Sequence, residues 1–282
     1  MLRIAVPNKG TLAAPAAQML REAGYRQRTD ERDLVCRDLA NDVEFFYLRP
    51  RDIATYVGSG DLALGITGRD LLIDAGSPAD ELLDLGFGGG TFRFAARPET
   101  VANVEEMEGR RIATSYPGVV ARYLTERGVK ADVIRLDGAV ENAVRLGVAD
   151  VIADVVSTGA TLRQAGLTVV GEPILESSAI LIGPAGSTVE LVTVVQLVRR
   201  LQGVLVARRY VMLAYDVRAD QLEVAVTLTP GIESPTVSPL HREGWVAVQA
   251  MVLRTSAHRI MDELYDMGAR AILVTDIHAC RL

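Results

Sequence analysis

Short apolar runs alternate with helix-like stretches along the first two thirds of the chain. Runs at residues 2–6, 44–48 and 62–66, and again at 111–114, 132–136 and 151–156, end in turns rich in Gly, Pro or polar residues, and a helical pattern follows. This alternation predicts two sets of β-turn-α units with parallel strands. Residues 85–94 begin with glycines and then alternate, which favours a strand crossing between the sets over a flexible linker. The pattern therefore predicts two lobes with facing turns around a cleft.

After residue 210 the pattern changes. Strands are predicted at 210–216, 245–253 and 271–276, a helix-to-turn transition within 222–228, a helix at 256–267, and a loop with three prolines at 229–239. This order fits the β-α-β-β-α-β pattern of a small ferredoxin-like α+β domain. We therefore predict an α/β protein with one lobe from residues 1–90 and 184–209, a second lobe from 91–183, and a C-terminal domain from 210–282.

Composition excludes several classes of protein. With 49% hydrophobic residues and 5% aromatics, the core consists mainly of Ala, Val, Leu and Ile. A net charge of -6 without a basic block argues against nonspecific nucleic-acid binding. Neither Cys36 and Cys280 nor the three histidines show a metal-ligand spacing, so no metal held by protein groups alone is expected. Without a secretory signal or an apolar run of about 18 residues, we expect a cytoplasmic protein outside the membrane.

The most informative segment is 153–162, where a buried strand breaks into Ser157, Thr158, Gly159, Ala160 and Thr161 before a helix. Backbone N–H groups at a helix N-terminus, with added hydroxyl donors and a glycine, favour an anion such as phosphate. Asp154, just upstream, would lie beside a ligand, where a sugar diol or a phosphate-bound magnesium ion suits it. An ordinary capped turn without a ligand explains the same residues.

One other polar residue follows a predicted strand and has a structural alternative. Lys9 lies at a strand-to-helix turn, where ligand sites of α/β sheets collect, and equally fits a solvated loop.

Several motifs, taken in order, match one family. The chain resembles the long-form ATP phosphoribosyltransferases of histidine biosynthesis. The resemblance covers essentially the whole chain, and the matching segments are residues 3–10, 48–53, 65–71, 135–141, 153–162, 230–236 and 261–264. It implies transfer of a phosphoribosyl group from phosphoribosyl pyrophosphate to N1 of ATP, with magnesium carried mainly by the substrate phosphates.

The resemblance also implies roles for particular residues. Residues 157–161 would hold the 5'-phosphate and Asp154 would lie near the ribose hydroxyls. Lys9 and Arg49 would contact the pyrophosphate or the nucleotide phosphates. The nucleotide would be seated by Asp70, Tyr116 and Glu141. The structural alternative is core packing at a turn for Tyr116 and a solvated helix surface for Glu141.

The C-terminal domain, by the same resemblance, is a sensor that binds histidine as a feedback inhibitor. The residues implied are Asp216, Ile232, Ser234, Thr236 and Ala271. The proline-rich loop that carries three of them also fits a domain-packing turn. A dimer–hexamer equilibrium is implied as the means of inhibition, and AMP is a further ligand that the resemblance allows.

Two other functions stay open from the residues alone. The two-lobed α/β core also resembles periplasmic binding proteins, so a non-catalytic binder of small molecules is the first alternative. The predicted phosphate loop argues against it. A phosphoribosyltransferase acting on a free base is the second alternative. Enzymes of that kind usually carry two adjacent acids before the loop, whereas this chain has Asp154 alone, followed by Val155 and Val156.

Overall fold

The computed structural model of the chain describes residues 1–156, 159–186 and 192–281. They form two compact units, the first made of Met1–Arg21 with Tyr25–Val194, the second of Glu22–Gly24 with Val195–Leu282. Helix α7 (Val192–Arg209) therefore falls mostly in the second unit, whereas residues 184–209 were predicted to belong to the first lobe.

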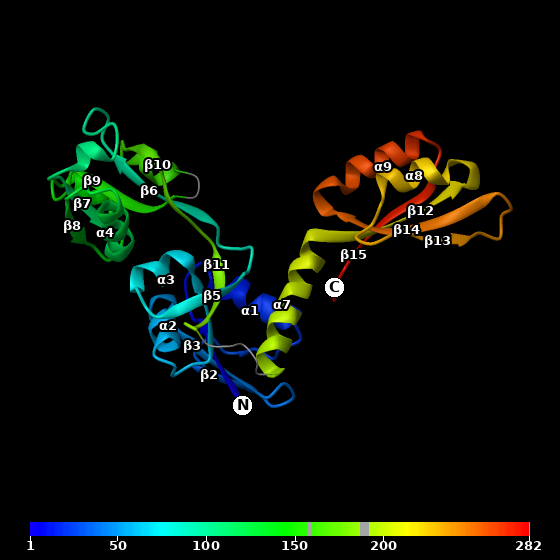
Figure 1. Cartoon of the computed structure of the whole chain (residues 1–282), viewed down its shortest axis with the longest axis horizontal. Helices are drawn as coiled ribbons and strands as arrows, with labels where there is room; N and C mark the ends of the chain where they lie inside the picture. The colour runs from blue at the N-terminus through cyan, green and yellow to red at the C-terminus, as the bar shows by residue number, and fades with distance from the viewer. Residues whose placement is uncertain (157–158, 187–191, 282) are drawn as a thin grey trace. The chain divides into compact units, whose positions relative to one another are not determined.

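The first lobe of the first unit is built on a six-stranded sheet. Its strand order is β2-β3-β1-β4-β11-β5 (Figure 1). The strands are β1 (Leu2–Pro7), β2 (Val35–Asp38), β3 (Val43–Leu48), β4 (Leu64–Gly68), β5 (Ala79–Asp84) and β11 (Ala179–Pro184). Helices α1 (Ala13–Glu22), α2 (Pro50–Gly58) and α3 (Arg69–Ala75) follow β1, β3 and β4 directly, so each β-to-α turn lies at the carboxyl end of a strand.

The second lobe contains a five-stranded sheet in the order β10-β6-β9-β7-β8. Its strands are β6 (Gly90–Ala96), β7 (Arg111–Thr114), β8 (Asp132–Arg135), β9 (Val151–Val156) and β10 (Thr168–Ser177). Its helices are α4 (Pro117–Glu126), α5 (Glu141–Arg145) and α6 (Ala160–Gln164), with a 3-10 turn η1 (Glu105–Met107). The chain enters this lobe through β6 and leaves it through β10, which pair with each other.

Both sheets are mixed rather than wholly parallel. Strand β1 pairs parallel with β3 and β4, and β7 pairs parallel with β8 and β9, as the β-turn-α pattern predicts. The strands that carry the chain between lobes run antiparallel to their neighbours, as β11 does beside β4 and β6 beside β9. Parallel strands were predicted for the β-turn-α units alone. A strand that returns from the other lobe enters its sheet in the opposite direction.

Apolar faces of the helices close the two cores. In the first lobe, α2 packs Ile53, Ala54 and Val57 against Ala5 and β11. In the second, α4 packs Val119 and Val120 against the sheet through Phe92 and Phe94, and all four side chains are buried. This burial of aliphatic and aromatic side chains supplies the main favourable free energy of the fold.

The C-terminal unit has the predicted β-α-β-β-α-β order. Strands β12 (Tyr210–Arg218), β13 (Thr236–Pro239), β14 (Trp245–Leu253) and β15 (Arg270–Asp276) form an antiparallel sheet in the order β13-β14-β12-β15. Helices α8 (Leu222–Leu228) and α9 (Ala257–Asp266), which follow the short 3-10 turns η2 (Ala219–Gln221) and η3 (Arg254–Ser256), lie on one face of it (Figure 1). Ser256 is the N-cap of α9, as expected, but its side chain makes no capping hydrogen bond. With the two-lobed α/β core, this confirms the predicted fold class.

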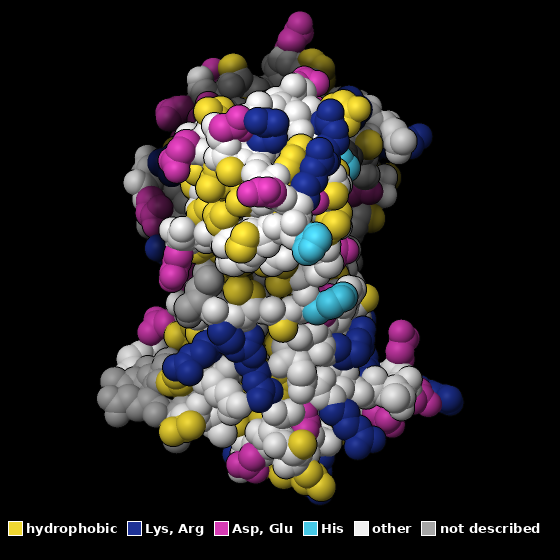
Figure 2. Space-filling view, turned by 90° about the vertical axis from the view of Figure 1, so that its right-hand side faces the viewer, with side chains coloured by type: hydrophobic (Ala, Val, Ile, Leu, Met, Phe, Trp, Pro, Cys, Tyr) yellow, Lys and Arg dark blue, Asp and Glu magenta, His cyan; other side chains and the backbone are white. Residues whose placement is uncertain are grey.

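The surface of the C-terminal unit mixes apolar and charged groups. Leu273 on β15 is 52% exposed and Tyr265 on α9 is 62% exposed. Figure 2 shows hydrophobic side chains among acidic and basic ones on this part of the molecule. Across the residues that the structure describes, no helix is long and apolar enough to span a membrane.

Candidate active site

A pocket of about 270 Å³ lies where the strand-to-helix turns of both lobes meet. The first lobe contributes the turns after β1 and β4, and the second contributes Tyr116 after β7 and Val155 on β9. Carboxyl ends of strands are where ligands bind in α/β sheets. The lining residues are Lys9, Gly10, Thr11, Leu12, Pro50, Gly68, Asp70, Leu71, Gly88, Tyr116, Val155 and Ser177. We call this the main pocket.

Asp70 is a buried acid at the base of the main pocket. Its side chain is placed by the first turn of α3, directly after β4. The Ser177 hydroxyl accepts a hydrogen bond from the Asp70 backbone N at 3.0 Å and donates one to Asp70 Oδ1 at 2.9 Å. A buried carboxylate needs such partners, because its desolvation is otherwise unfavourable.

Tyr116 enters the main pocket from the turn between β7 and α4. Its ring packs edge-on against Phe92, with 5.3 Å between centroids. Burial raises the pKa of its hydroxyl well above the ordinary value, and the nearby charges of Asp70 and Asp154 raise it further. Tyr116 therefore stays protonated and can donate a hydrogen bond to a ligand.

Asp154 lies beside a smaller cavity of about 120 Å³ in the second lobe. Glu141 at the start of α5, and Gly159, Ala160 and Thr161 also line it, and Val155 borders both cavities. Burial raises the pKa of Asp154, and the charges of Glu141 and Asp70 add to that effect. The structure thus brings together Asp70, Tyr116, Glu141 and Asp154, which the sequence analysis took from four separate turns.

The predicted phosphate loop is described only in part. Ser157 and Thr158 lie outside the described residues. Gly159 is the N-cap of α6 with a left-handed φ of 68°, a conformation that favours glycine. A Cβ placed on Gly159 would lie 3.1 Å from Nη1 of Arg163, a cation that the sequence analysis did not single out.

The two cations expected in the site differ in placement. Lys9 lines the main pocket and also a neighbouring pocket of about 510 Å³. Arg21 and Arg28 line this second pocket as well, and neither was found from the sequence. Arg49 is the N-cap of α2. Its neighbour Pro50 lines the main pocket, but Arg49 is not among the described residues that line either of these two pockets.

Arg51, which the sequence analysis also passed over, connects the lobes next to the main pocket. Its Nη1 donates to Asp74 Oδ2 at 2.6 Å and its Nη2 to the Ser115 carbonyl at 2.8 Å. Asp74 Oδ1 in turn accepts from the Gly118 backbone N at 2.8 Å, in the first turn of α4. Arg51 and Asp74 thus hold the turn that carries Tyr116.

The residues expected to bind histidine lie on three strands of the C-terminal sheet and in the loop before one of them. Asp216 on the inner strand β12 is the register partner of Arg270, and Ala271, with φ of 50°, lies in the bulge that follows on the edge strand β15. Thr236 begins β13 at the opposite edge, and Ile232 and Ser234 precede it. The strand β14 separates β12 from β13.

Residues 1–156, 159–186 and 192–281 contain no metal-binding group of side chains, that is, no group of three His, Cys, Asp or Glu residues that could hold a metal ion. The acids Asp70, Asp154 and Glu141 are close enough to interact electrostatically. Their arrangement suits contacts to a cation already bound by substrate oxygens better than a cage of protein ligands.

Two α/β lobes that share a polar pocket, followed by a small antiparallel domain, define a two-lobed α/β enzyme core with an appended α+β domain. Residues 49–203 match the family model of ATP phosphoribosyltransferase, and residues 207–279 match that of the "HisG, C-terminal domain". The chain therefore belongs to the ATP phosphoribosyltransferase family, a family of transferases of histidine biosynthesis. This confirms the resemblance identified from its motifs.

Individual relatives agree with this assignment. The ATP phosphoribosyltransferase of Salinispora tropica is 73% identical over 289 residues, and that of Streptomyces coelicolor is 62% identical over 285 residues, each covering 100% of both chains. The solved ATP phosphoribosyl transferase (HisG:HisZ) complex from Thermotoga maritima matches with a TM-score of 0.63 at 25% identity. That match covers 73% of this chain and 98% of the other.

Proposed function

We propose that this chain transfers the phosphoribosyl group of phosphoribosyl pyrophosphate to N1 of the adenine ring of ATP. The N1 lone pair forms the new bond to the anomeric carbon, and the electrons of the broken carbon–oxygen bond leave with pyrophosphate. The observation that supports this best is the convergence of Lys9, Asp70 and Tyr116 on one pocket of a chain that belongs to this family.

Binding and orientation supply most of the rate in such a reaction. The transition state is loose, with positive charge on the ribose, and needs no protein nucleophile. Lys9 would neutralise charge on the departing pyrophosphate, and Arg21 and Arg28 in the adjoining pocket suit further phosphate groups. Holding both substrates at reacting distance converts a bimolecular step into a unimolecular one.

The second lobe would bind the phosphoribosyl group. Thr161 and the backbone of residues 159–161 border the small cavity and would hold the 5'-phosphate, with Asp154 near the ribose hydroxyls. Ser157 and Thr158 belong to the same proposal from the sequence. Asp70, Tyr116 and Glu141 would seat the nucleotide, because a carboxylate beside adenine suits its exocyclic amine as N1 attacks.

Arg49 remains in the proposal as a contact for phosphate groups, on the basis of the motif alone. Magnesium would come bound to the pyrophosphate and keep most of its water ligands. Its chemistry is charge neutralisation on the leaving group. The protein groups nearest to it would be Asp70 and Asp154, through water.

Regulation by histidine is the second part of the proposal. Asp216 on β12 and Ala271 on β15, with Thr236 on β13 and Ile232 and Ser234 before it, would form the binding site. The motifs of the family also imply a dimer–hexamer equilibrium, in which histidine favours the larger, inhibited form.

The central experiment measures phosphoribosyl-ATP formation from ATP and phosphoribosyl pyrophosphate, with a pyrophosphate-coupled assay as the second readout. We expect product from ATP and none from free adenine. Binding of both compounds without release of pyrophosphate would favour the non-catalytic binder, and turnover of free adenine would favour the base-specific enzyme.

Two substitutions test the assignment of the substrates. Thr161→Ala should raise the KM for phosphoribosyl pyrophosphate about tenfold and leave histidine binding unchanged. Thr125→Ala is the matched control, because this exposed threonine on α4 donates only to the Ala121 carbonyl, at 2.7 Å. A larger effect of Thr161→Ala on histidine binding than on KM would place the phosphate site elsewhere.

Histidine inhibition is tested separately. Asp216→Ala should abolish inhibition by millimolar histidine while turnover without histidine stays the same. Asp220→Ala is the control, since Asp220 is exposed and paired with Arg218 at 2.8 Å. Equal inhibition of both variants would refute the role of Asp216.

A further inference from the structure

Ser177 is the last residue of β10, at the point where the chain leaves the second lobe. The sequence analysis did not select it, yet it lines the main pocket together with Asp70. Asp70 and Ser177 are 8% and 7% exposed, so water has little access to either. A buried serine in a substrate pocket either contacts the ligand or orients a neighbour that does.

The hydroxyl of Ser177 makes two hydrogen bonds, both to Asp70. It accepts from the Asp70 backbone N at 3.0 Å, one of the N–H groups in the first turn of α3 that have no partner within the helix. It donates to Asp70 Oδ1 at 2.9 Å. One hydroxyl therefore fixes the start of α3 and the orientation of the carboxylate together.

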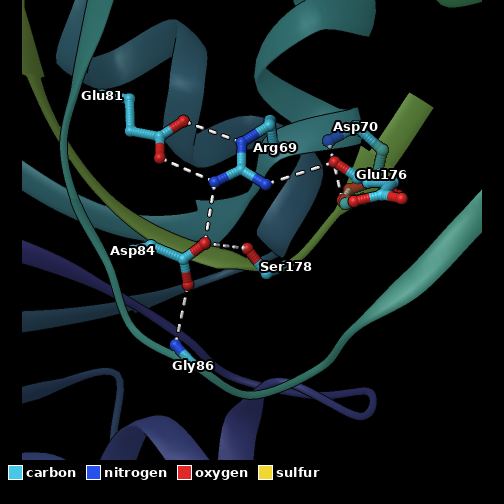
Figure 3. A network of polar contacts seen from close by, with 8 residues as sticks. Arg69, Asp70, Glu81, Asp84, Gly86, Glu176 and Ser178 are labelled. Atoms are coloured by element: carbon cyan, nitrogen blue, oxygen red, sulfur yellow. Dashed lines mark hydrogen bonds and ion pairs between the residues drawn. The ribbon is translucent and has the colours of Figure 1, made fainter. Parts of the chain in front are cut away.

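The backbone around Ser177 is itself fixed by Arg69, as Figure 3 shows. The Arg69 backbone N donates to the Ser178 carbonyl at 3.0 Å, and Arg69 Nη1 donates to the Glu176 carbonyl at 3.2 Å. The same guanidinium binds Glu81 with two hydrogen bonds of 2.8 and 2.7 Å and Asp84 at 2.9 Å. Ser177 is thus held on both sides and can hold Asp70 in turn.

We propose that Ser177 is a positioning residue, which holds the Asp70 carboxylate in the orientation that binds the nucleotide. This inference rests on the proposed function, in which Asp70 helps to seat ATP. Without the hydroxyl, Asp70 Oδ1 loses its donor and the carboxylate gains rotational freedom in the pocket. Part of the binding energy for ATP is then used to order it again.

Steady-state kinetics of Ser177→Ala test the proposal. We expect the KM for ATP to rise about tenfold and the KM for phosphoribosyl pyrophosphate to stay within about twofold. Ser177→Thr keeps the hydroxyl and should recover most of the loss. Ser178→Ala is the matched control, because this neighbouring hydroxyl donates to Asp84 Oδ2 at 2.8 Å, outside the main pocket, and its kinetics should equal those of the unmodified protein.

A double substitution separates positioning from general stability. If Ser177 acts through Asp70, Ser177→Ala should add less than about twofold to the effect of Asp70→Asn. Equal kinetics of Ser177→Ala and Ser178→Ala, or full additivity with Asp70→Asn, would overturn the inference while leaving the proposed function intact. A lack of phosphoribosyl-ATP formation by the unmodified protein would overturn both.

Discussion

Replacing Arg51 by alanine tests how strongly the two lobes are joined at the turn that carries Tyr116. Arg51 lies on α2 of the first lobe, and its guanidinium donates to Asp74 of α3 and to the Ser115 carbonyl of the second lobe. Asp74 also accepts from the Gly118 backbone N. The substitution removes both hydrogen bonds of Arg51 and leaves the Asp74 carboxylate with the backbone donor.

The size of the effect follows from burial. The Asp74 side chain is 8% exposed, but that of Arg51 is 35% exposed. Removing one partner of a fully buried ion pair costs about 3–5 kcal/mol, whereas exposed pairs contribute about 0–1 kcal/mol. Because water reaches one side of Arg51, we expect an intermediate loss of about 2 kcal/mol in the free energy of unfolding of the first unit.

Urea unfolding followed by far-ultraviolet circular dichroism provides the assay. Fluorescence would not serve, because the single tryptophan, Trp245, lies in the C-terminal unit. Arg51→Ala, Asp74→Ala and the double variant form a cycle, with an expected coupling of about 1–2 kcal/mol.

Arg122→Ala is the control for this cycle. It breaks the exposed Arg122–Glu126 pair on α4, at 3.0 Å, and should cost under about 0.5 kcal/mol. A coupling below about 0.3 kcal/mol in the Arg51–Asp74 cycle, or equal losses from Arg51→Ala and Arg122→Ala, would refute the reasoning.

Three further predictions concern single sites. Burial and the charges of Glu141 and Asp70 raise the pKa of Asp154, so its ionised form is lost at a higher pH than for an ordinary aspartate. Glu141→Gln removes one of these charges, and the acid limb of the pH profile of kcat/KM for phosphoribosyl pyrophosphate should therefore move to lower pH. An acid limb at the same pH in this variant would contradict the prediction. A Cβ on Gly118 would overlap the Asp74 carbonyl, so Gly118→Ala should destabilise the first unit by about 1–3 kcal/mol in the same urea assay. Gly128 has open space around it but a φ of 69°, so Gly128→Ala should destabilise the protein by about 1 kcal/mol through backbone strain alone. The buried hydroxyls of Tyr215 and Thr229 are 2.8 Å apart, so Tyr215→Phe should lower the stability of the C-terminal unit by about 1 kcal/mol, measured through Trp245 fluorescence; no change would mean that the hydroxyls contribute no net stability.

Much of the fold follows from the spacing of apolar residues. The pattern predicted a strand over 245–253, and β14 has these bounds. Within 222–228 it predicted a helix-to-turn transition, where the structure has the helix α8. It missed β13, since all four residues of that strand are exposed and two of them are Pro and Ser. An edge strand with little burial has no apolar periodicity to detect.

Part of the candidate site was predictable from the sequence. The strand pattern indicated Lys9 and the family motifs indicated Asp70 and Tyr116, and the structure places all three around the main pocket. Ser177 was not predictable, because its hydrogen-bond partner Asp70 is 107 positions away in the sequence and the contact forms only where the chain returns from the second lobe. Arg49 and Arg51 belong to the same sequence motif, and the motif does not show which of these two arginines joins the lobes. The directions of their side chains on either side of Pro50 depend on the packing of α2.

The position of β11 between β4 and β5 determines the order in which the protein can fold during synthesis. Among the described strands, β5 pairs only with β11, although about a hundred residues of chain separate the two strands. A nascent chain that has just completed β5 therefore lacks the native partner of this strand. The whole second lobe, whose ends Gly90 and Ser177 are register partners, must emerge from the ribosome first. We expect the second lobe, a continuous segment, to fold before the first lobe closes around β11.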